Sequence, residues 1–124
     1  MNIRAIKIDP IQQQITEYLW KNTEDFEELY REIGNGCRTI QVTPYDKNNV
    51  LLCDEDGRIK PVKGAFVIMD HPETYFMNLI IAGIAFIVGV GNGDDFGDAT
   101  VGVETVGQAI AWYDKDACAE LQLY

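Results

Sequence analysis

Apolar residues are most concentrated between Phe76 and Gly93, where the chain reads FMNLIIAGIAFIVGVGNG. Many of them are β-branched or aromatic, which favours strands over a helix. We therefore expect a short strand near Asn78–Ala82 and a longer one near Ile84–Val90. Because the longer strand is apolar on both sides, it should be covered on both faces and lie at the centre of a sheet. A membrane-spanning helix needs roughly 20 apolar residues, and this run is shorter and interrupted by glycines.

The first part of the chain predicts a hairpin followed by a helix. Strands are expected near Asn2–Asp9 and Gln14–Trp20, joined by a turn that begins at Asp9-Pro10. A helix is expected near Thr23–Ile33, because apolar residues recur there at i, i+3, i+4 and i+7. Asn22 or Thr23 would cap its start, and a glycine would end it. The apolar stripe is Phe26, Leu29, Tyr30 and Ile33, and the candidate final glycines are Gly34 and Gly36.

The middle of the chain predicts further strands. Alternating apolar residues indicate one at Arg38–Thr43, and a run rich in β-forming residues indicates another at Ala65–Met69. Between them, Asn49–Cys53 and Arg58–Val62 are expected to form a hairpin around an acidic turn that ends in Gly57.

The last part of the chain predicts a second helix near Thr105–Tyr113 and a final strand near Cys118–Tyr124. The whole pattern indicates one α+β domain over residues 1–124. Its sheet should be mixed but mostly antiparallel, with one or two helices packed on it.

Composition adds a strongly acidic balance, with a net charge of −10 in 124 residues. Such a chain repels nucleic-acid phosphates and anionic membrane surfaces, so neither is an expected partner. It would attract a basic protein. The alternative is that the acidity serves only solubility.

The chemistry of cysteine and histidine is sparse. Three cysteines, Cys37, Cys53 and Cys118, lie in or beside apolar patterns without a paired spacing, which is typical of buried thiols in a reducing compartment. His71 is the single histidine, so a zinc site is not expected. No secretory signal is visible at the N-terminus. We therefore expect a cytoplasmic protein without a cofactor.

Two local motifs match known sites only in part. Asp54-Glu55-Asp56-Gly57 begins like a calcium loop, but Arg58 and Ala65 stand where that loop needs oxygen ligands, so a turn is the better interpretation. Gly89–Gly93 follows a strand as a phosphate-binding loop would, but it has no lysine and precedes two aspartates. We interpret it as a flexible loop at the sheet edge.

The acidic segment near residue 95 is a second candidate. Its carboxylates could gather a divalent cation or act as an acid–base pair. No histidine or nucleophile accompanies them, so neither a metal site nor an active site is predicted. The residues are Asp94, Asp95, Asp98 and Glu104.

The overall pattern resembles an uncharacterised family of small domains common in phages and mobile elements. The likeness extends to about Val103 and rests on the hairpin, the helix ending near Ile33-Gly34, the acidic turn followed by Ile59-Lys60, and the run Ile81–Gly89 before the acidic loop. It implies a phage or plasmid origin and an accessory role towards the host. It supplies no catalytic residues.

Large aromatic residues suggest self-association. Tyr18 and Trp20 lie on one side of the second strand while Ile15 and Leu19 lie on the other, so this strand is apolar on both faces. Aromatic side chains are enriched at interfaces, although core packing is the alternative. We expect a homo-oligomer that uses Tyr18 and Trp20.

The leading hypothesis is a non-enzymatic accessory protein that binds a basic host protein through an acidic surface, as a nucleic-acid mimic or an inhibitor of host defence would. It requires the acidic residues to gather on one face. The predicted contact residues are Asp54, Glu55, Asp56, Asp94, Asp95 and Asp98, with Asp46 nearby.

The alternative hypothesis is an oligomer that binds or sequesters a nucleotide-like small molecule. The glycine-rich loop would supply backbone N–H groups and an aromatic side chain would supply a stacking face. The positive charge would come from an arginine or lysine at a concave site between subunits. The predicted ligand-binding residues are Gly91, Asn92, Gly93 and Arg38, with Arg4, Arg31 or Lys60 as further candidate cations.

Overall fold

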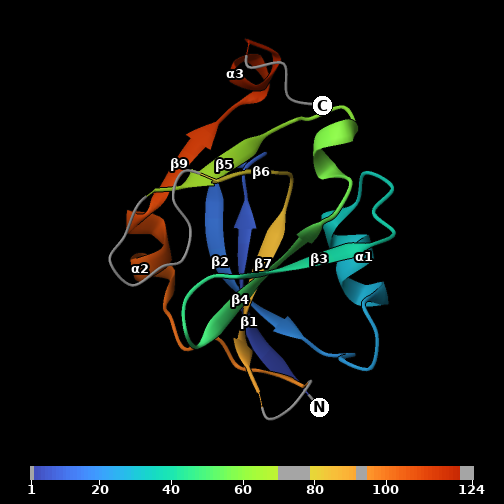
Figure 1. The fold of residues 1–124 in the computed structure, drawn as a ribbon, viewed down its shortest axis with the longest axis vertical. Coiled ribbons are helices and arrows are strands. Elements are labelled where there is room, and N and C mark those ends of the chain that lie inside the picture. The colour runs from blue at the N-terminus through green and yellow to red at the C-terminus, as the bar shows by residue number, and fades with distance from the viewer. Residues whose placement is uncertain (1, 70–78, 92–94, 121–124) are drawn as a thin grey trace.

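A computed structural model describes residues 2–69, 79–91 and 95–120, which form two antiparallel sheets and short helices (Figure 1). The larger sheet has the strand order β2-β1-β7-β4-β3, and β8 adds to β7. Its strands are β1 (Ile3–Asp9), β2 (Gln14–Trp20), β3 (Ile40–Pro44), β4 (Asn49–Asp54), β7 (Ala85–Val90) and β8 (Phe96–Gly97).

The smaller sheet has the order β6-β5-β9. It consists of β5 (Ala65–Ile68), β6 (Leu79–Ala82) and β9 (Ile110–Tyr113). The helical elements are α1 (Glu27–Ile33), the single 3₁₀ turn η1 (Gly57–Ile59), α2 (Val103–Gln108) and α3 (Lys115–Glu120). The α+β fold predicted from the sequence is confirmed, as is the mostly antiparallel pairing.

Strand β7 is the centre of the larger sheet, as its double-sided apolar pattern predicted. It pairs with β1 on one side and β4 on the other. Phe86 and Val88 enter the core on the α1 side, whereas Ala85 and Ile87 enter the core beneath the smaller sheet. Each face of β7 is therefore covered by a different layer.

The two cores have different covers. On one face, Leu29 and Ile33 of α1 pack on Leu52 and Phe86 of the sheet. On the other, Phe66 of the smaller sheet and Val106 of α2 belong to the core cluster that contains the opposite face of the larger sheet. The domain is thus three-layered, with the larger sheet in the middle. None of the helices in the described ranges is long and apolar enough to cross a membrane.

Helix α1 confirms the apolar stripe but begins at Glu27 rather than at the predicted Thr23. Local side chains take the backbone donors that an earlier helix start would need. The Asn22 carboxamide oxygen accepts from Glu24 N–H at 3.4 Å, and the Asp25 carboxylate accepts from Glu27 N–H at 3.0 Å. Gly34, at φ 68°, ends the helix as predicted.

The predicted hairpin of Asn49–Cys53 with Arg58–Val62 is wrong. Strand β4 already has β3 and β7 as its two neighbours, so no edge remains for a third strand. After Asp54 the chain forms η1 instead. The strand predicted at Arg38–Thr43 is found two residues later, as β3.

The C-terminal prediction is wrong in two places. The expected helix Thr105–Tyr113 is split into α2 and β9, because Ile110 and Trp112 pair with Ile68 and Phe66 of β5. The expected strand Cys118–Tyr124 contains the end of α3, which buries Cys118, and residues 121–124 lie outside the described part. Residues 70–77, left open by the sequence, also lie outside it.

The Glu28 carboxylate joins the β1–β2 hairpin to α1 through three hydrogen bonds. Glu28 accepts from the Tyr18 hydroxyl at 2.5 Å and from the backbone N–H groups of Lys21 at 3.1 Å and Asn22 at 2.9 Å. Burial raises the pKa of Glu28, but these three donors outweigh it and hold the pKa below 4.5. Burial and the Glu28 contact raise the pKa of Tyr18.

We expect Glu28→Ala to lower the free energy of unfolding by about 1–2 kcal/mol, because three donors lose their charged acceptor. Glu27→Ala is the control, because the Glu27 side chain lies on the same helix and forms no hydrogen bond or ion pair with another described residue. It should change the free energy of unfolding by less than about 0.5 kcal/mol. Urea denaturation of the two variants measures this, and equal losses would contradict the role of Glu28.

The same carboxylate predicts a pH dependence. A folded-state pKa below the ordinary 4.5 means that Glu28 stabilises the fold above that pH, and that this stabilisation is lost as the pH falls through the folded-state value. The stability difference between the wild type and Glu28→Ala should therefore shrink in acid. A difference that stays constant between neutral pH and about pH 3 would contradict this assignment.

Candidate functional site

One face of the larger sheet carries exposed apolar side chains beyond the reach of α1. Strand register places Val42 opposite buried Leu52, Val50 opposite Val88, and Val90 opposite Phe96. Residues paired directly across strands share a face, and Leu52 and Val88 belong to the core on the α1 side. Val42 is 47% exposed and Val90 is 54% exposed. Together they extend the core outward as an apolar strip.

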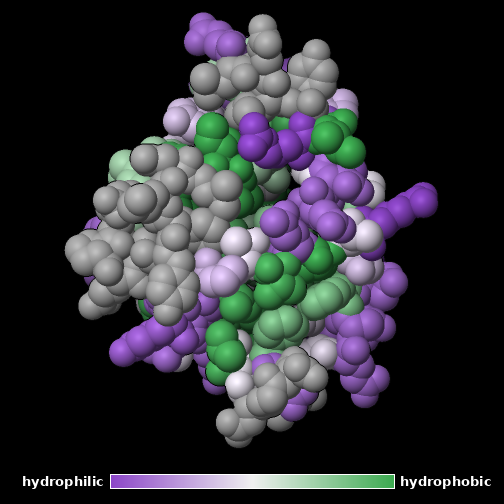
Figure 2. All heavy atoms as spheres, in the orientation of Figure 1, coloured by the Kyte–Doolittle hydropathy of each residue, from purple (hydrophilic) through white to green (hydrophobic). Residues whose placement is uncertain are grey.

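Figure 2 shows apolar side chains gathered over the middle of the visible face, where β4 and β7 lie in Figure 1, with hydrophilic side chains around them. The strip consists of Val42, Val50, Val90 and Phe96.

A groove of about 780 Å³ lies at the end of the sheet beside this strip. Its described lining comes from the start of β1, the segment before α1, Gly91 after β7, and residues 95–98. Phe96 belongs both to its wall and to the strip. The described lining residues are Asn2, Ile3, Thr23, Glu24, Gly91, Asp95, Phe96, Gly97 and Asp98.

Three carboxylates line the groove, on Glu24, Asp95 and Asp98. Asp98 accepts the backbone N–H of Arg4 at 2.8 Å, which fixes its position. Within the described ranges, none of the three forms an ion pair with a lysine or arginine. The described lining of the groove therefore carries three negative groups and no lysine or arginine.

Glycines allow the acidic segment to fold this closely against β7. A Cβ at Gly89 would collide with the Asp98 carbonyl oxygen, and one at Gly91 would lie 2.6 Å from the Asp95 carbonyl oxygen. Gly91 N–H also donates to that Asp95 oxygen at 2.9 Å. Glycine is therefore required at positions 89 and 91 by close backbone packing, and a ligand is not needed to explain it there.

Asn49 anchors the neighbouring loops. It is fully buried, and its amide donates to Asp46 at 2.9 Å and to the Thr100 hydroxyl at 2.8 Å. Its carbonyl oxygen accepts Thr100 N–H at 2.9 Å. Asp46 and the Asp95–Asp98 segment are therefore tied to the same end of the sheet.

The acidic turn Asp54–Asp56 lies at the opposite end, because β4 runs antiparallel to β7. Asp54 is only 7% exposed and pairs with Lys60 at 2.7 Å, while Glu55 and Asp56 are exposed. The described members of the predicted acidic set are therefore divided between the two ends of the sheet and do not form one cluster. Asp95 and Asp98 share the groove, and Asp94 lies outside the described residues.

The predicted small-molecule site is not brought together within the chain. Gly91 lines the groove, but Arg38 precedes β3 at the other end of the sheet. Asn92 and Gly93 lie outside the described residues. The Arg4 guanidinium is bound to Glu17 at 2.8 Å and to the carbonyl oxygens of Ala99 and Val101.

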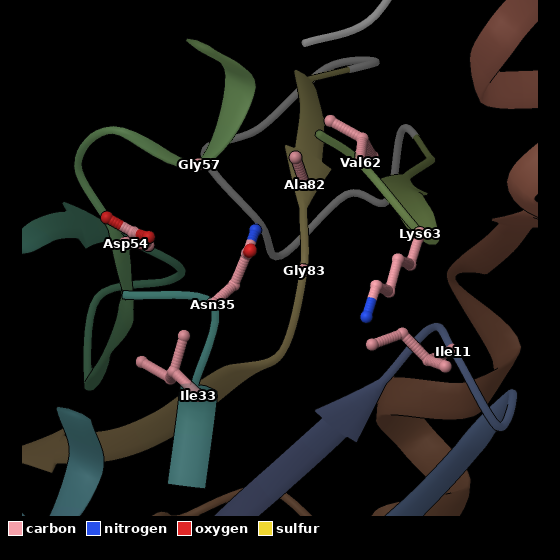
Figure 3. A pocket seen from close by; sticks show the side chains of 9 residues that line it. All are labelled: Ile11, Ile33, Asn35, Asp54, Gly57, Val62, Lys63, Ala82 and Gly83. Carbon is pink, nitrogen blue, oxygen red and sulfur yellow. The ribbon is translucent and has the colours of Figure 1, made fainter. Parts of the chain in front are cut away.

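A small cavity of about 40 Å³ lies near Asp54, at the opposite end from the groove. Figure 3 shows side chains from separate segments around it, with Asn35 and Asp54 on one side and Lys63 on the other. Its volume suits one or two water molecules and is far too small for a nucleotide.

Trp20 does not form the predicted self-association surface, because it is 1% exposed and packs against Phe26 and Phe96. Tyr18 is half-buried, with its ring 5.1 Å from that of Phe86. Core packing, the alternative considered for these aromatics, is what the structure shows. Oligomerisation itself stays a prediction.

Comparison with known proteins places the chain in a family. A family model described as a domain of unknown function, DUF3846, matches residues 3–111. The chain belongs to this family. The DUF3846 description names no activity, phage or mobile element, so the resemblance seen in the sequence is confirmed only as membership of a family of unknown function. No curated protein and no solved structure matches the chain.

The thiols of this DUF3846 domain are structural. Burial, and then Asp54, raises the pKa of Cys37 and of Cys53 to about 11, which keeps both protonated and weakly nucleophilic at neutral pH. Burial and Asp114 raise the pKa of Cys118. In the described ranges, no three His, Cys, Asp or Glu residues are grouped so as to hold a metal ion.

Sequence reasoning missed the apolar strip and Glu24. Val42 and Val50 were visible as apolar residues of two predicted strands. Which face of the sheet each side chain occupies depends on how β3 and β4 pair with each other and with β7. Phe96 was assigned to an acidic loop, although an aromatic residue amid DDFGD signals a buried anchor.

We expect Gly89→Ala to displace β8, because the new methyl group would occupy the position of the Asp98 carbonyl. The free energy of unfolding should fall by about 2 kcal/mol, and Ala99 N–H, which donates to Arg4 O at 2.8 Å, should lose protection from exchange. Gly102→Ala is the matched control, since nothing lies within 4 Å of its new Cβ. Unchanged Ala99 protection in Gly89→Ala would contradict the close packing.

Proposed function

We propose that this domain is a non-enzymatic cytoplasmic accessory protein that binds a basic protein through its acidic–apolar face. This face comprises the apolar strip and the three groove carboxylates, that is Val42, Val50, Val90 and Phe96 with Glu24, Asp95 and Asp98. The observation that carries the proposal is that the strip adjoins a groove whose carboxylates have no cationic partner in the described ranges.

The apolar strip supports a protein as the partner. Contiguous exposed apolar side chains rimmed by polar ones mark interaction surfaces. Val42 and Val90 are about half exposed, although they continue directly from buried Leu52 and Val88. A partner that covers them would gain apolar burial, which a soluble small ion would not provide.

The charge supports a basic partner. A net charge of −10 accelerates association with a positively charged protein, and like-charged proteins are repelled. Only the Asp95–Asp98 end contributes to the proposed face. The Asp54–Asp56 turn lies at the opposite end of the sheet, so the two acidic segments do not form one continuous surface that would imitate a long nucleic acid. A phage or mobile-element origin and an inhibitory role towards a host rest on the sequence resemblance alone.

The nucleotide-binding alternative gains no support from the placement of its residues. Gly91 and Arg38 lie at opposite ends of the sheet. The described thiols are buried and protonated, which favours a non-enzymatic role.

Photo-crosslinking in the source cells tests the proposal. A photoreactive amino acid at Val90 should cross-link one basic protein at high yield. The same amino acid at Ile59, which is 76% exposed at the opposite end of the sheet, is the matched control and should give little product.

The charge requirement is tested in the same cells. Adding Asp95→Asn and Asp98→Asn to the Val90 variant should lower the yield about tenfold, and higher salt should slow association of the purified pair. Equal products from positions 59 and 90, or an acidic partner, would overturn the proposal. A product that contains only a second copy of this chain would instead assign the face to self-association.

A further inference from the structure

We propose that the groove binds an arginine side chain of the partner, between the Phe96 ring and the carboxylates of Glu24, Asp95 and Asp98. This inference rests on the proposed function, because it names the group on the basic partner that the acidic–apolar face recognises.

The aromatic wall is held in place from behind. Phe96 lines the groove, and its ring centroid lies 6.1 Å from Trp20 and 6.1 Å from Phe26. Trp20 and Phe26 are stacked with centroids 5.9 Å apart. The three rings support one another, so a ligand need not order Phe96 on binding, which lowers the entropic cost of association.

Trp20 marks this cluster as unusual. It is 1% exposed, and its indole N–H is the one buried side-chain polar group in the described ranges that has no hydrogen-bond partner. A buried donor normally finds an acceptor. Its cross-strand partner Ile3 and its ring neighbour Phe96 both line the groove. The Trp20 residue therefore contacts or pairs with two residues of the groove wall.

The groove carboxylates provide the negative charge that would attract a guanidinium group. Asp95 and Glu24 are exposed, and Asp98 is fixed by the Arg4 backbone N–H at 2.8 Å. Arg4, whose backbone N–H binds Asp98, has no free guanidinium, because its side chain binds Glu17 and two backbone carbonyls. A cation from a partner would thus meet negative groups that have no ion pair with another described residue.

A guanidinium group matches this combination better than other cations do. It is planar, stacks on aromatic faces and donates two parallel hydrogen bonds to a carboxylate, whereas a lysine ammonium is a compact point charge. A bare divalent ion would need several converging carboxylates, and the described residues hold no such group. The groove, at about 780 Å³, also has room for a peptide around the side chain.

Continuity with the apolar strip favours a protein arginine over a free cation. Val90 pairs with Phe96 across β7 and β8, so a chain whose arginine enters the groove would pass over Val90 and Val50. Charge complementarity positions the arginine, and apolar contact adds affinity beside it.

Nuclear magnetic resonance titration of the ¹⁵N-labelled protein with acetyl-Gly-Arg-Gly-amide tests the inference. We expect saturable shifts of the Gly97 and Asp98 amides and of the Trp20 indole N–H. Because citrulline keeps the shape but lacks the charge, its peptide should bind roughly tenfold more weakly. The lysine peptide should bind about threefold more weakly than the arginine peptide, since it stacks less well.

Matched variants separate the aromatic and acidic contributions. Phe96→Leu keeps an apolar wall without an aromatic face and should remove the preference for arginine over lysine. Asp95→Asn, at an exposed position, should weaken both peptides about threefold or more. Asp56→Asn, at the opposite end of the sheet, removes the same charge and should leave binding unchanged. If Phe96→Leu fails to fold, the binding of the arginine and lysine peptides to Asp95→Asn and Asp56→Asn still tests whether the groove is the binding site.

The outcomes separate this inference from the proposed function. Equal binding of arginine and lysine peptides, weakened by Asp95→Asn, would overturn the arginine assignment but leave a basic partner intact. Shifts confined to Glu55 and Asp56 would overturn both, as would an absence of shifts with any cationic peptide at millimolar concentration. Equal binding of the citrulline peptide would overturn the role of charge.

Discussion

The requirement that β7 be covered on both faces organises the whole domain. Phe86 and Val88 point to one side and Ala85 and Ile87 to the other, and all four are fully buried. A strand of this kind is stable only between two layers. The smaller sheet with α2 supplies one layer, and the seven-residue helix α1 supplies the other.

The unequal size of these two layers explains where the candidate site lies. Helix α1 is too short to cover its whole side of the sheet, so the side chains beyond it, Val42 and Val90, stay about half exposed. At the end of the same side, Gly89 and Gly91 let the acidic segment fold back on β7. Apolar and acidic groups thereby meet on one surface, which is the physical basis of the proposed protein-binding role.

Sequence patterns predicted the parts of the fold that depend on local or double-sided hydrophobicity. The hairpin β1–β2, the stripe of α1 and the central position of β7 were all visible. The errors at Arg58–Val62 and Thr105–Tyr113 share one cause, because the number of free strand edges decides whether a segment can pair. Strand β4 is paired on both edges, whereas β5 had a free edge with which β9 pairs. A local sequence pattern does not show which distant segment will pair with a given strand edge.

The candidate site was predicted in part for the same reason. Asp95 and Asp98 were identified by their charge, but their separation from Asp54 follows from the antiparallel direction of β4 and β7. Trp20 was predicted to be a surface aromatic, but its ring packs against Phe26 and Phe96 in the core. Glu24 reaches the groove only because the hairpin and α1 bring it beside the start of β1.

Hydrogen–deuterium exchange of the protein alone and in its native complex tests the central claim most directly, because it reports every covered segment at once. A partner on the acidic–apolar face should slow exchange in β3, at the end of β7 and in β8, and leave residues 54–59 unchanged. Protection centred on residues 54–59, or on the outer edge of β2, with β8 unaffected, would contradict the account.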